Sequence, residues 1–164
     1  MLYLLDANVL ITASRTYYEI SRVPEFWAWL VHMGEQNNVK IVQEVYEEIT
    51  VGNDELASWV KQPGVEAALR FSETVDINQV RVVTAKGYAS DLTDDEIEKI
   101  GRDPFLLAYA IVDPANRCIV TTEISKPKRT RGNRKIPNVC SDFGIKCFNT
   151  FELTAALDFS TSWQ

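Results

Sequence analysis

The chain has 164 residues, of which 46% are hydrophobic and 24% charged, a balance typical of one soluble globular domain. No stretch approaches the roughly 18 continuous apolar residues of a membrane span, and no basic segment precedes an apolar run, so we expect neither a membrane anchor nor a secretory signal. The one histidine, His32, leaves little basis for a Ser-His-Asp triad or a histidine-rich zinc site. If the protein is an enzyme, its polar groups are therefore expected to be carboxylates.

The predicted elements alternate along the chain. Short apolar or β-branched strands are expected at residues 2–5, 39–42, 118–121 and 145–148. Helices are expected at residues 24–33, 43–51, 54–61, 65–71, 74–88 (the last partly extended), 97–100, 103–112 and 150–157, and Thr93 with Glu96 forms a capping-box pattern. This alternation predicts an α/β fold: a three-layer α/β/α sandwich with a central, mainly parallel sheet of four to five strands. We expect a single domain over residues 1–164, with residues 52–100 as an insert or enlarged helical lobe.

Asp6 is the first polar residue that needs an explanation. It follows the strand LYLL and precedes another apolar piece in LYLLDANVLI, and a buried carboxylate is costly unless it is paired, hydrogen-bonded or bound to a metal. Asn8, two residues later, could orient Asp6 or a bound water. A turn or helix cap explains both residues equally well.

Three glutamates follow the second strand in QEVYEEIT. At about 100° per residue, Val45 and Ile49 define the buried side of this helix and Glu48 lies beside them. Glu48 is therefore expected to reach inward, while Glu44 and Glu47 are expected on a solvated face.

Two further acids lie where elements begin or end. Asp103 precedes Pro104 at the start of an almost wholly apolar helix, a pattern that predicts a helix N-cap whose carboxylate faces the strand edge. Glu123 lies just past the strand in CIVTTE, with Thr121 beside it. An ordinary loop acid is the alternative for Glu123.

The four acids share one predicted edge, because sites in such sheets form outside the carboxyl ends of the strands. Asp6, Glu48, Asp103 and Glu123 would repel one another and raise one another's pKa values unless a cation neutralises them. Ligation by oxygen alone favours Mg²⁺ or Mn²⁺ over zinc. The residues therefore predict metal-assisted hydrolysis, most plausibly of a phosphodiester.

At these residues the chain resembles a known family, the PIN-domain nucleases. LLDANVLI, VYEEI, DPFLLAYA and IVTTE resemble the four motifs of that family, in the right order over residues 2–123. The tail IPNVCSDFGIKCFNTFEL further resembles a bacterial PIN-like branch catalogued only as a domain of unknown function. Two features depart from the pattern: Glu123 stands where Asp is common, and residues 52–100 make the chain longer than a minimal toxin of this kind.

The resemblance implies a Mg²⁺- or Mn²⁺-dependent endoribonuclease that leaves a 5′-phosphate and a 3′-hydroxyl. It implies that Asp6, Glu48, Asp103 and Glu123 hold the metal, with Asn8 and Thr121 as orienting residues. Many bacterial members are toxins of toxin–antitoxin pairs, held inactive by a small antitoxin, and many form homodimers. RNA, an antitoxin protein and a second copy of the chain are therefore the expected partners.

The segment KPKRTRGNRK (126–135) departs from the overall charge of −6, because it holds six cations and no acid. Removing these six charges leaves a net charge of −12 on the rest of the chain. Because the segment directly follows Glu123, we expect it to bind substrate phosphates or an acidic antitoxin segment; a solvated loop is the alternative. The cations are Lys126, Lys128, Arg129, Arg131, Arg134 and Lys135.

The remaining alternatives concern compartment and activity. The three cysteines, Cys118, Cys140 and Cys147, have no zinc spacing, so we expect buried thiols in a reducing cytoplasm. A catalytically inactive PIN-like module, with the acids kept as caps and RNA or protein as partner, would share the same motifs. A haloacid-dehalogenase-like phosphatase would require a second Asp at the position of Asn8, so Asn8 counts against that alternative.

Overall fold

The computed structural model describes residues 1–163 and contains one all-parallel sheet. Its strands are β1 (Leu2–Leu5), β2 (Val39–Lys40), β3 (Arg117–Val120) and β4 (Lys146–Phe148), in the order β2-β1-β3-β4. Residues 69–71 add hydrogen bonds just past the end of β2, from Ile41 N to Leu69 O at 2.7 Å and from Phe71 N to Ile41 O at 2.8 Å. The predicted α/β class with a central parallel sheet is confirmed, with four strands.

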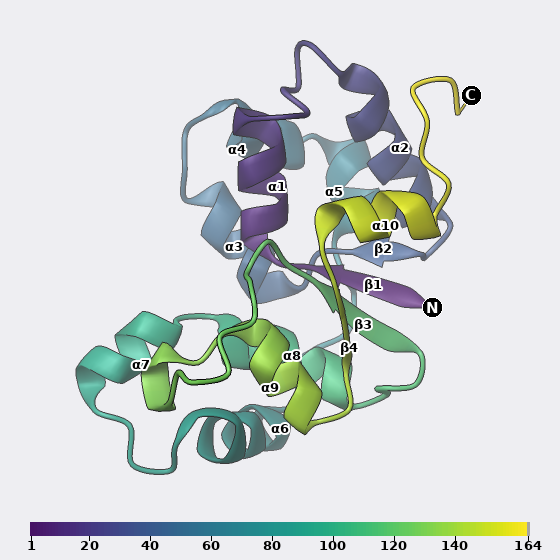
Figure 1. Ribbon diagram of the computed structural model, residues 1–164. Helices are drawn as coiled ribbons and strands as arrows, with labels where there is room; N and C mark the ends of the chain where they lie inside the picture. Colours follow the sequence, from purple (N-terminus) through teal and green to yellow (C-terminus); the bar gives the residue numbers. More distant parts are fainter. Residues whose placement is uncertain (164) are drawn as a thin grey trace.

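Helices cover both faces of this sheet (Figure 1). One layer holds α1 (Ala7–Arg15), α2 (Pro24–Glu35), α4 (Glu55–Val60), α5 (Pro63–Leu69) and α10 (Thr150–Ala156). The other holds α6 (Ile77–Val82), a π-helix (Val83–Tyr88), α7 (Asp94–Ile100), α8 (Asp103–Ile111) and α9 (Ile136–Asp142). Helix α3 (Gln43–Thr50) follows β2 and contacts α1, α4 and α8.

The long helical interval 52–100 does not form one lobe. Its first two helices, α4 and α5, pack in the layer with α2, whereas α6, the π-helix and α7 lie in the layer of α8 (Figure 1). The chain crosses from one face of the sheet to the other between residues 70 and 77, so the helices of this interval are divided between the two layers. Within residues 1–163, no helix is long and apolar enough to cross a membrane.

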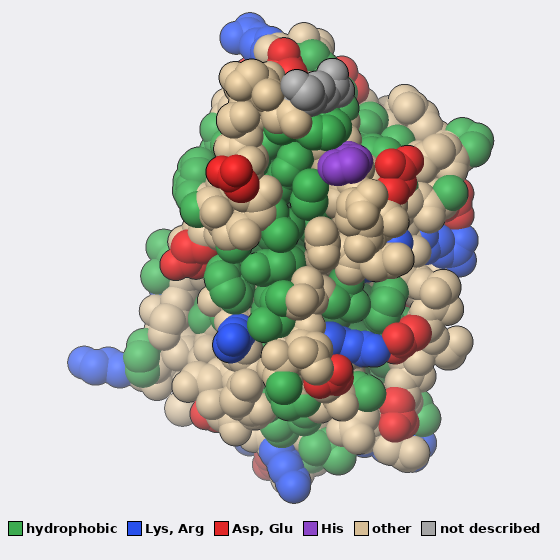
Figure 2. Space-filling view, turned by 90° about the vertical axis from the view of Figure 1, so that its right-hand side faces the viewer, with side chains coloured by type: hydrophobic (Ala, Val, Ile, Leu, Met, Phe, Trp, Pro, Cys, Tyr) green, Lys and Arg blue, Asp and Glu red, His purple; other side chains and the backbone are tan. Residues whose placement is uncertain are grey.

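Helix α8 is the centre of the lower layer. Six of its nine residues are buried: Pro104, Leu106, Leu107, Ala108, Tyr109 and Ala110. This confirms the burial expected from its apolar sequence, and it holds the helix N-terminus rigidly at the sheet. His32, by contrast, stacks on Trp163 with 5.1 Å between ring centroids, among hydrophobic side chains on the face where the strands begin (Figure 2). It therefore lies at the opposite end of the sheet from the candidate acids.

The π-helix and α9 meet at an unusually close approach. Ala89 N donates to Thr84 O at 3.0 Å, a bond that spans five residues instead of four. A Cβ at Gly87 would lie 2.6 Å from Val139 Cγ1, so only glycine fits against α9 there. This packing carries Tyr88, the last residue of the π-helix, toward the start of α8.

A buried lysine joins the upper helices to the edge strand. Lys40, 8% exposed, donates from Nζ to Gly34 O at 2.9 Å and to Ala68 O at 2.6 Å. These carbonyls lie in the last turns of α2 and α5, where backbone acceptors have no partner within the helix. Burial lowers the pKa of Lys40, and the two carbonyls compensate part of that cost.

We predict that Gly34→Ala destabilises the fold at this junction. The added Cβ would lie 2.7 Å from both Ala68 O and Leu69 Cδ2, and overpacking of this kind costs about 1–3 kcal/mol. Gly64→Ala is the matched control, since nothing lies within 4 Å of its Cβ position in α5. Urea unfolding should show a lower midpoint for Gly34→Ala only; equal midpoints for both variants would contradict the close packing.

Candidate active site

The topology places a crevice at the carboxyl ends of β1 and β3. The chain leaves β1 toward β2 on one side and leaves β3 toward β4 on the other, so the two connections diverge between neighbouring strands. Ligand sites in open parallel sheets form at such a switch point. Asp6 follows β1 and Thr121 follows β3, and Asp6 N donates to Val120 O at 2.9 Å. Both side chains are therefore held at this point by the sheet itself.

Asp6 is buried and hydrogen-bonded. The residue is only 6% exposed. Its Oδ2 atom accepts a hydrogen bond from Thr121 Oγ1 at 2.7 Å and a longer one from Asn8 Nδ2 at 3.4 Å. Burial raises the pKa of Asp6; the Thr121 and Asn8 bonds lower it, and the charge of Glu123 raises it. Asn8 and Thr121 thus contact the acid that they were expected to orient.

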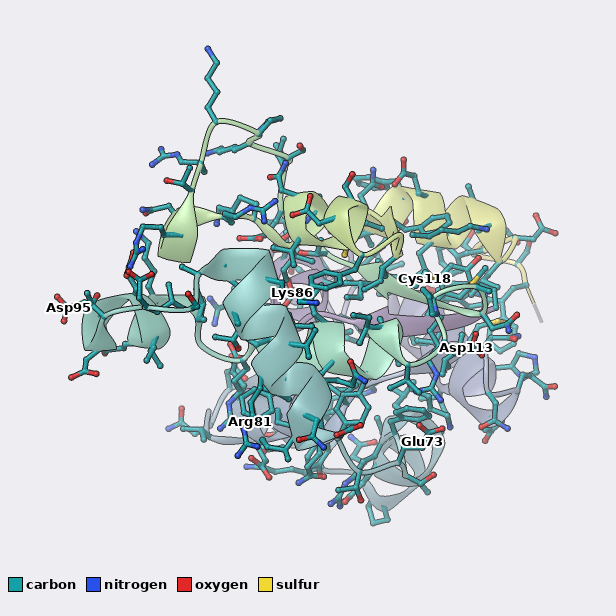
Figure 3. All side chains as sticks on the ribbon, turned by 90° about the horizontal axis from the view of Figure 1, so that it is seen from below. Glu73, Arg81, Lys86, Asp95, Asp113 and Cys118 are labelled. Carbon is teal, nitrogen blue, oxygen red and sulfur yellow. The ribbon has the colours of Figure 1, made fainter. Side chains whose placement is uncertain are left out.

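Asp103 lies within the first turn of α8. The N-cap is Arg102, and Asp103 is the first helical residue, so the predicted N-cap role is wrong. Its side chain is free to face the crevice instead, where Tyr88 Oη donates to Oδ2 over a long 3.5 Å. Figure 3 shows the supporting elements from below, with α6 and the π-helix, marked by Arg81 and Lys86, running in front of α8.

The charges of the other three predicted acids all raise the pKa of Asp103. Its pKa is raised from 3.8 to about 8, first by burial and then by the charges of Asp6 and Glu123, with a smaller contribution from Glu48. Lys135 is the cation that partly offsets this rise. Acids from four parts of the chain therefore contribute to the electrostatics of Asp103 at the edge of the sheet.

Glu48 and Glu47 face in different directions on α3. Glu48 is exposed at the rim of the crevice, and partial burial of its carboxyl and the charge of Asp6 raise its pKa. Glu47 is exposed, accepts from Gln43 at 2.7 Å and pairs with Arg102 at 3.0 Å. The exposure of Glu47 agrees with its expected outward position, whereas Glu48 is also exposed, so its expected inward reach stays a prediction.

Glu123 is held by the segment that follows it. Lys135 Nζ pairs with Oε1, and Ile136 N donates to Oε2 at 2.8 Å. Glu123 N in turn donates to Thr121 Oγ1 at 3.1 Å. Both carboxylate oxygens therefore already have partners, and within residues 1–163 no group of three or more Asp, Glu, His or Cys side chains is already arranged to hold one ion.

The basic segment is divided by its contacts. Arg131 bonds to Asp91 and Glu96 of the α7 region with distances of 2.8–2.9 Å, and Arg134 donates to Gly87 O at 2.6 Å and pairs with Asp142. With Lys135 on Glu123, half of the six cations are engaged within the chain. The other three, Lys126, Lys128 and Arg129, are exposed, and none forms an ion pair within residues 1–163.

A pocket of about 350 Å³ joins the acids to these cations. Asp103, Glu123, Lys126 and Arg129 all line it. Lys99 of α7 also lines it, held by a hydrogen bond to Asn133. Sequence reasoning missed Lys99 because it lies 34 residues from its partner and belongs to no motif.

A larger cavity, of about 710 Å³, lies away from these acids, between α3, α5 and the loop that follows α5. Glu44 lines it, and its Oε2 is buried without a hydrogen-bond partner within residues 1–163. The expectation that Glu44 lies on a solvated face is wrong, because Tyr109 of the buried α8 packs beside it. Burial and the charge of Glu44 raise the pKa of Tyr109 to about 12.

Comparison with known proteins gives a family for this chain. The family model described as "Domain of unknown function (DUF4411)" matches residues 3–161. The chain belongs to the DUF4411 family. No curated protein and no solved structure matches it. The matched range of the DUF4411 model contains every residue of the candidate site.

We predict that Asp103→Asn stabilises this DUF4411 protein at high pH. A folded-state pKa of about 8 against an ordinary 3.8 means that the native state binds the proton more tightly. The contribution of Asp103 to stability is therefore greatest near pH 4 and is lost as pH rises toward 8, by on the order of 5 kcal/mol. Urea unfolding between pH 4 and pH 8 should show that the variant gains stability only toward the upper end.

The control for this measurement is Asp95→Asn. Asp95 is exposed on α7 and points away from the crevice (Figure 3), so its replacement should produce no comparable gain between pH 4 and pH 8. If Asp103→Asn and Asp95→Asn changed the pH profile equally, the clustering of charge around Asp103 would not be real.

Proposed function

We propose that this protein is a PIN-like, divalent-metal-dependent endoribonuclease. The observation that carries the proposal is the gathering of acids at one strand edge: Asp103 and Glu123 line one pocket with Asn8, whose side chain bonds to the buried Asp6 carboxylate. Four acids lie at this edge, and Lys135, whose side chain is partly exposed, pairs with one of them, Glu123. Such an excess of negative charge is the electrostatic condition for a cation site.

The donor set fits a hard cation. Carboxylate oxygens from Asp6, Glu48 and Asp103 would hold Mg²⁺ or Mn²⁺, which prefer oxygen ligands. When bound, such an ion lowers the pKa of a water and neutralises charge that develops on a phosphate. Thr121 and Asn8 would keep the Asp6 carboxylate in place through the two hydrogen bonds to Oδ2.

The positive rim supports a phosphodiester substrate. Lys126 and Arg129 line the same pocket as Asp103, and both are exposed. They would bind backbone phosphates on either side of the bond that is cut, as cations do in other nucleic-acid interfaces. The other half of the basic segment is engaged within the chain, so the predicted RNA-binding set is reduced here to Lys126, Lys128 and Arg129, with Lys99 added.

The resemblance to PIN-domain toxins extends the proposal. We infer that the enzyme acts in the cytoplasm as the toxin of a toxin–antitoxin pair, that a small antitoxin protein holds it inactive, and that two copies form a homodimer. Hydrolysis would leave a 5′-phosphate and a 3′-hydroxyl on the RNA products.

A second candidate function is a catalytically inactive PIN-like binding module. The observation in its favour is Glu123, whose two oxygens are both occupied by contacts within the chain. In such a module the basic rim would bind RNA or an acidic protein segment, and the acids would serve only local structure. The two functions differ in whether RNA is cut.

We predict metal-dependent RNA cleavage that requires Asp6. Purified protein should cut labelled RNA with Mg²⁺ or Mn²⁺ and lose activity in EDTA, and Asp6→Asn should lower the rate by about 100-fold or more, as expected for loss of a group that stabilises the transition state. Glu47→Gln, which removes an outward-facing acid from the same helix as Glu48, is the matched control and should keep most activity. Activity that survives both EDTA and Asp6→Asn would overturn the mechanism.

We predict that Lys126→Gln with Arg129→Gln weakens RNA binding in a salt-dependent way. With EDTA present to prevent cleavage, the slope of log affinity against log salt should flatten by about 0.7 per lost phosphate contact on a single strand. Lys128→Gln removes an exposed cation that does not line the pocket, and it should flatten the slope less. Equal effects of all three substitutions would mean that the pocket rim has no special role.

A further inference from the structure

Lys135 differs from the other basic residues of the segment because it pairs with Glu123, an acid of the candidate site. It is the N-cap of α9, and its ammonium pairs with Glu123 Oε1 while the next backbone N–H, that of Ile136, donates to Oε2 at 2.8 Å. The Glu123 carboxylate is thus turned toward the start of α9. Lys135 also lines the pocket that contains Asp103 and Asn8, and its side chain is 37% exposed.

The backbone around Lys135 is firmly held. Arg134, directly before it, donates to Gly87 O at 2.6 Å and to Asn138 O at 3.2 Å. Gly132 packs so closely on α7 that a Cβ there would lie 2.8 Å from Glu96 Cβ. Arg131 forms ion pairs with Glu96 of α7 and with Asp91, which precedes that helix. A lysine side chain is long, but this one starts from an anchored position and ends on a carboxylate.

Lys135 is the cation of the basic segment that pairs with an acid of the candidate site, and it lines the same pocket as Asp103. The neighbouring guanidinium groups of Arg131 and Arg134 are committed to Asp91, Glu96 and Asp142. Lys135 is therefore the cation that this segment contributes to the acids themselves.

We infer that Lys135 is a resident cation of the acidic site, which keeps Glu123 away from a divalent ion and leaves Asp6, Glu48 and Asp103 to hold one ion. This inference rests on the proposed function and adds to it the number of ions and a positioning residue. The physical reason is that an ammonium and a divalent ion repel each other if they share one carboxylate, whereas two separate carboxylate sites on either side of Thr121 let both remain. Glu123 thus binds the protein's own cation, and the other three acids bind the metal.

Isothermal titration of the full chain with Mn²⁺ tests the inference without any reaction. The wild type should bind one ion. Lys135→Gln should release Glu123 and either admit a second ion or tighten Mn²⁺ binding by about tenfold, a change well within the energy of a charge pair at close range. Lys126→Gln, which removes the same charge from the pocket rim, should change the affinity by only about twofold, as expected for a solvent-exposed charge.

Two further variants separate the role of Lys135 from simple loss of charge. Glu123→Gln should bind Mn²⁺ like the wild type, because Glu123 is not a ligand while Lys135 holds it. The double variant Lys135→Gln/Glu123→Gln should lose the gain of Lys135→Gln. Lys135→Arg, which keeps the charge, should retain one ion at wild-type affinity, and circular dichroism should show that each variant is folded.

The outcomes separate this inference from the proposed function. If wild type binds Mn²⁺ but Lys135→Gln matches Lys126→Gln, or if Glu123→Gln abolishes binding, Lys135 is not a resident cation, while the proposed nuclease survives. If neither wild type nor Lys135→Gln binds Mn²⁺ at millimolar concentration, both proposals fail. If Lys135→Gln does not fold, the Glu123→Gln and Lys135→Arg titrations decide the question alone.

Discussion

Burial of the Asp6 carboxylate is the constraint around which this edge of the fold is built. A buried acid needs hydrogen-bond donors, and Thr121 supplies the shorter bond, at 2.7 Å, from the end of the neighbouring strand. The same hydroxyl accepts from Glu123 N at 3.1 Å, so its donor and acceptor capacities are both used. One small side chain thereby fixes the ends of β1 and β3 to each other and sets where Glu123 begins to turn away.

Charge balance follows from this arrangement. Acids gathered at a sheet edge destabilise the fold unless cations approach them, and here Lys135 pairs with Glu123 while Lys99, Lys126 and Arg129 line the same pocket. Lys135 is the N-cap of α9, and Arg131 fixes the basic segment to the α7 region through Asp91 and Glu96. The basic segment therefore serves two purposes, because its second half builds the wall of the pocket from which its first half projects.

Much of this could be predicted from local sequence. Apolar runs identified the strands and the buried helix α8, and strand ends identified Asp6 and Glu123. What could not be predicted depends on partners distant in sequence: Arg131 binds acids 35 and 40 residues away, and one carboxylate oxygen of Glu44 is buried at the cavity that Tyr109 of α8 also lines. Helix α9, with seven residues, was missed because it is too short to display a helical period, and nothing in VTAKGY signals a π-helix.

The π-helix before Tyr88 bears on how this fold tolerates changes in chain length. A π turn is an α-helix that has absorbed one extra residue without displacing what lies on either side. The segment from Val83 to Tyr88 therefore contains one residue more than α-helical winding needs, and it includes the close contact of Gly87 with α9. A one-residue deletion before Gly87 would be taken up by a return to α-helical winding, and Tyr88 would keep its place beside Asp103. The same deletion in α8, where every turn is already α-helical and buried, would rotate Asp103 out of the crevice.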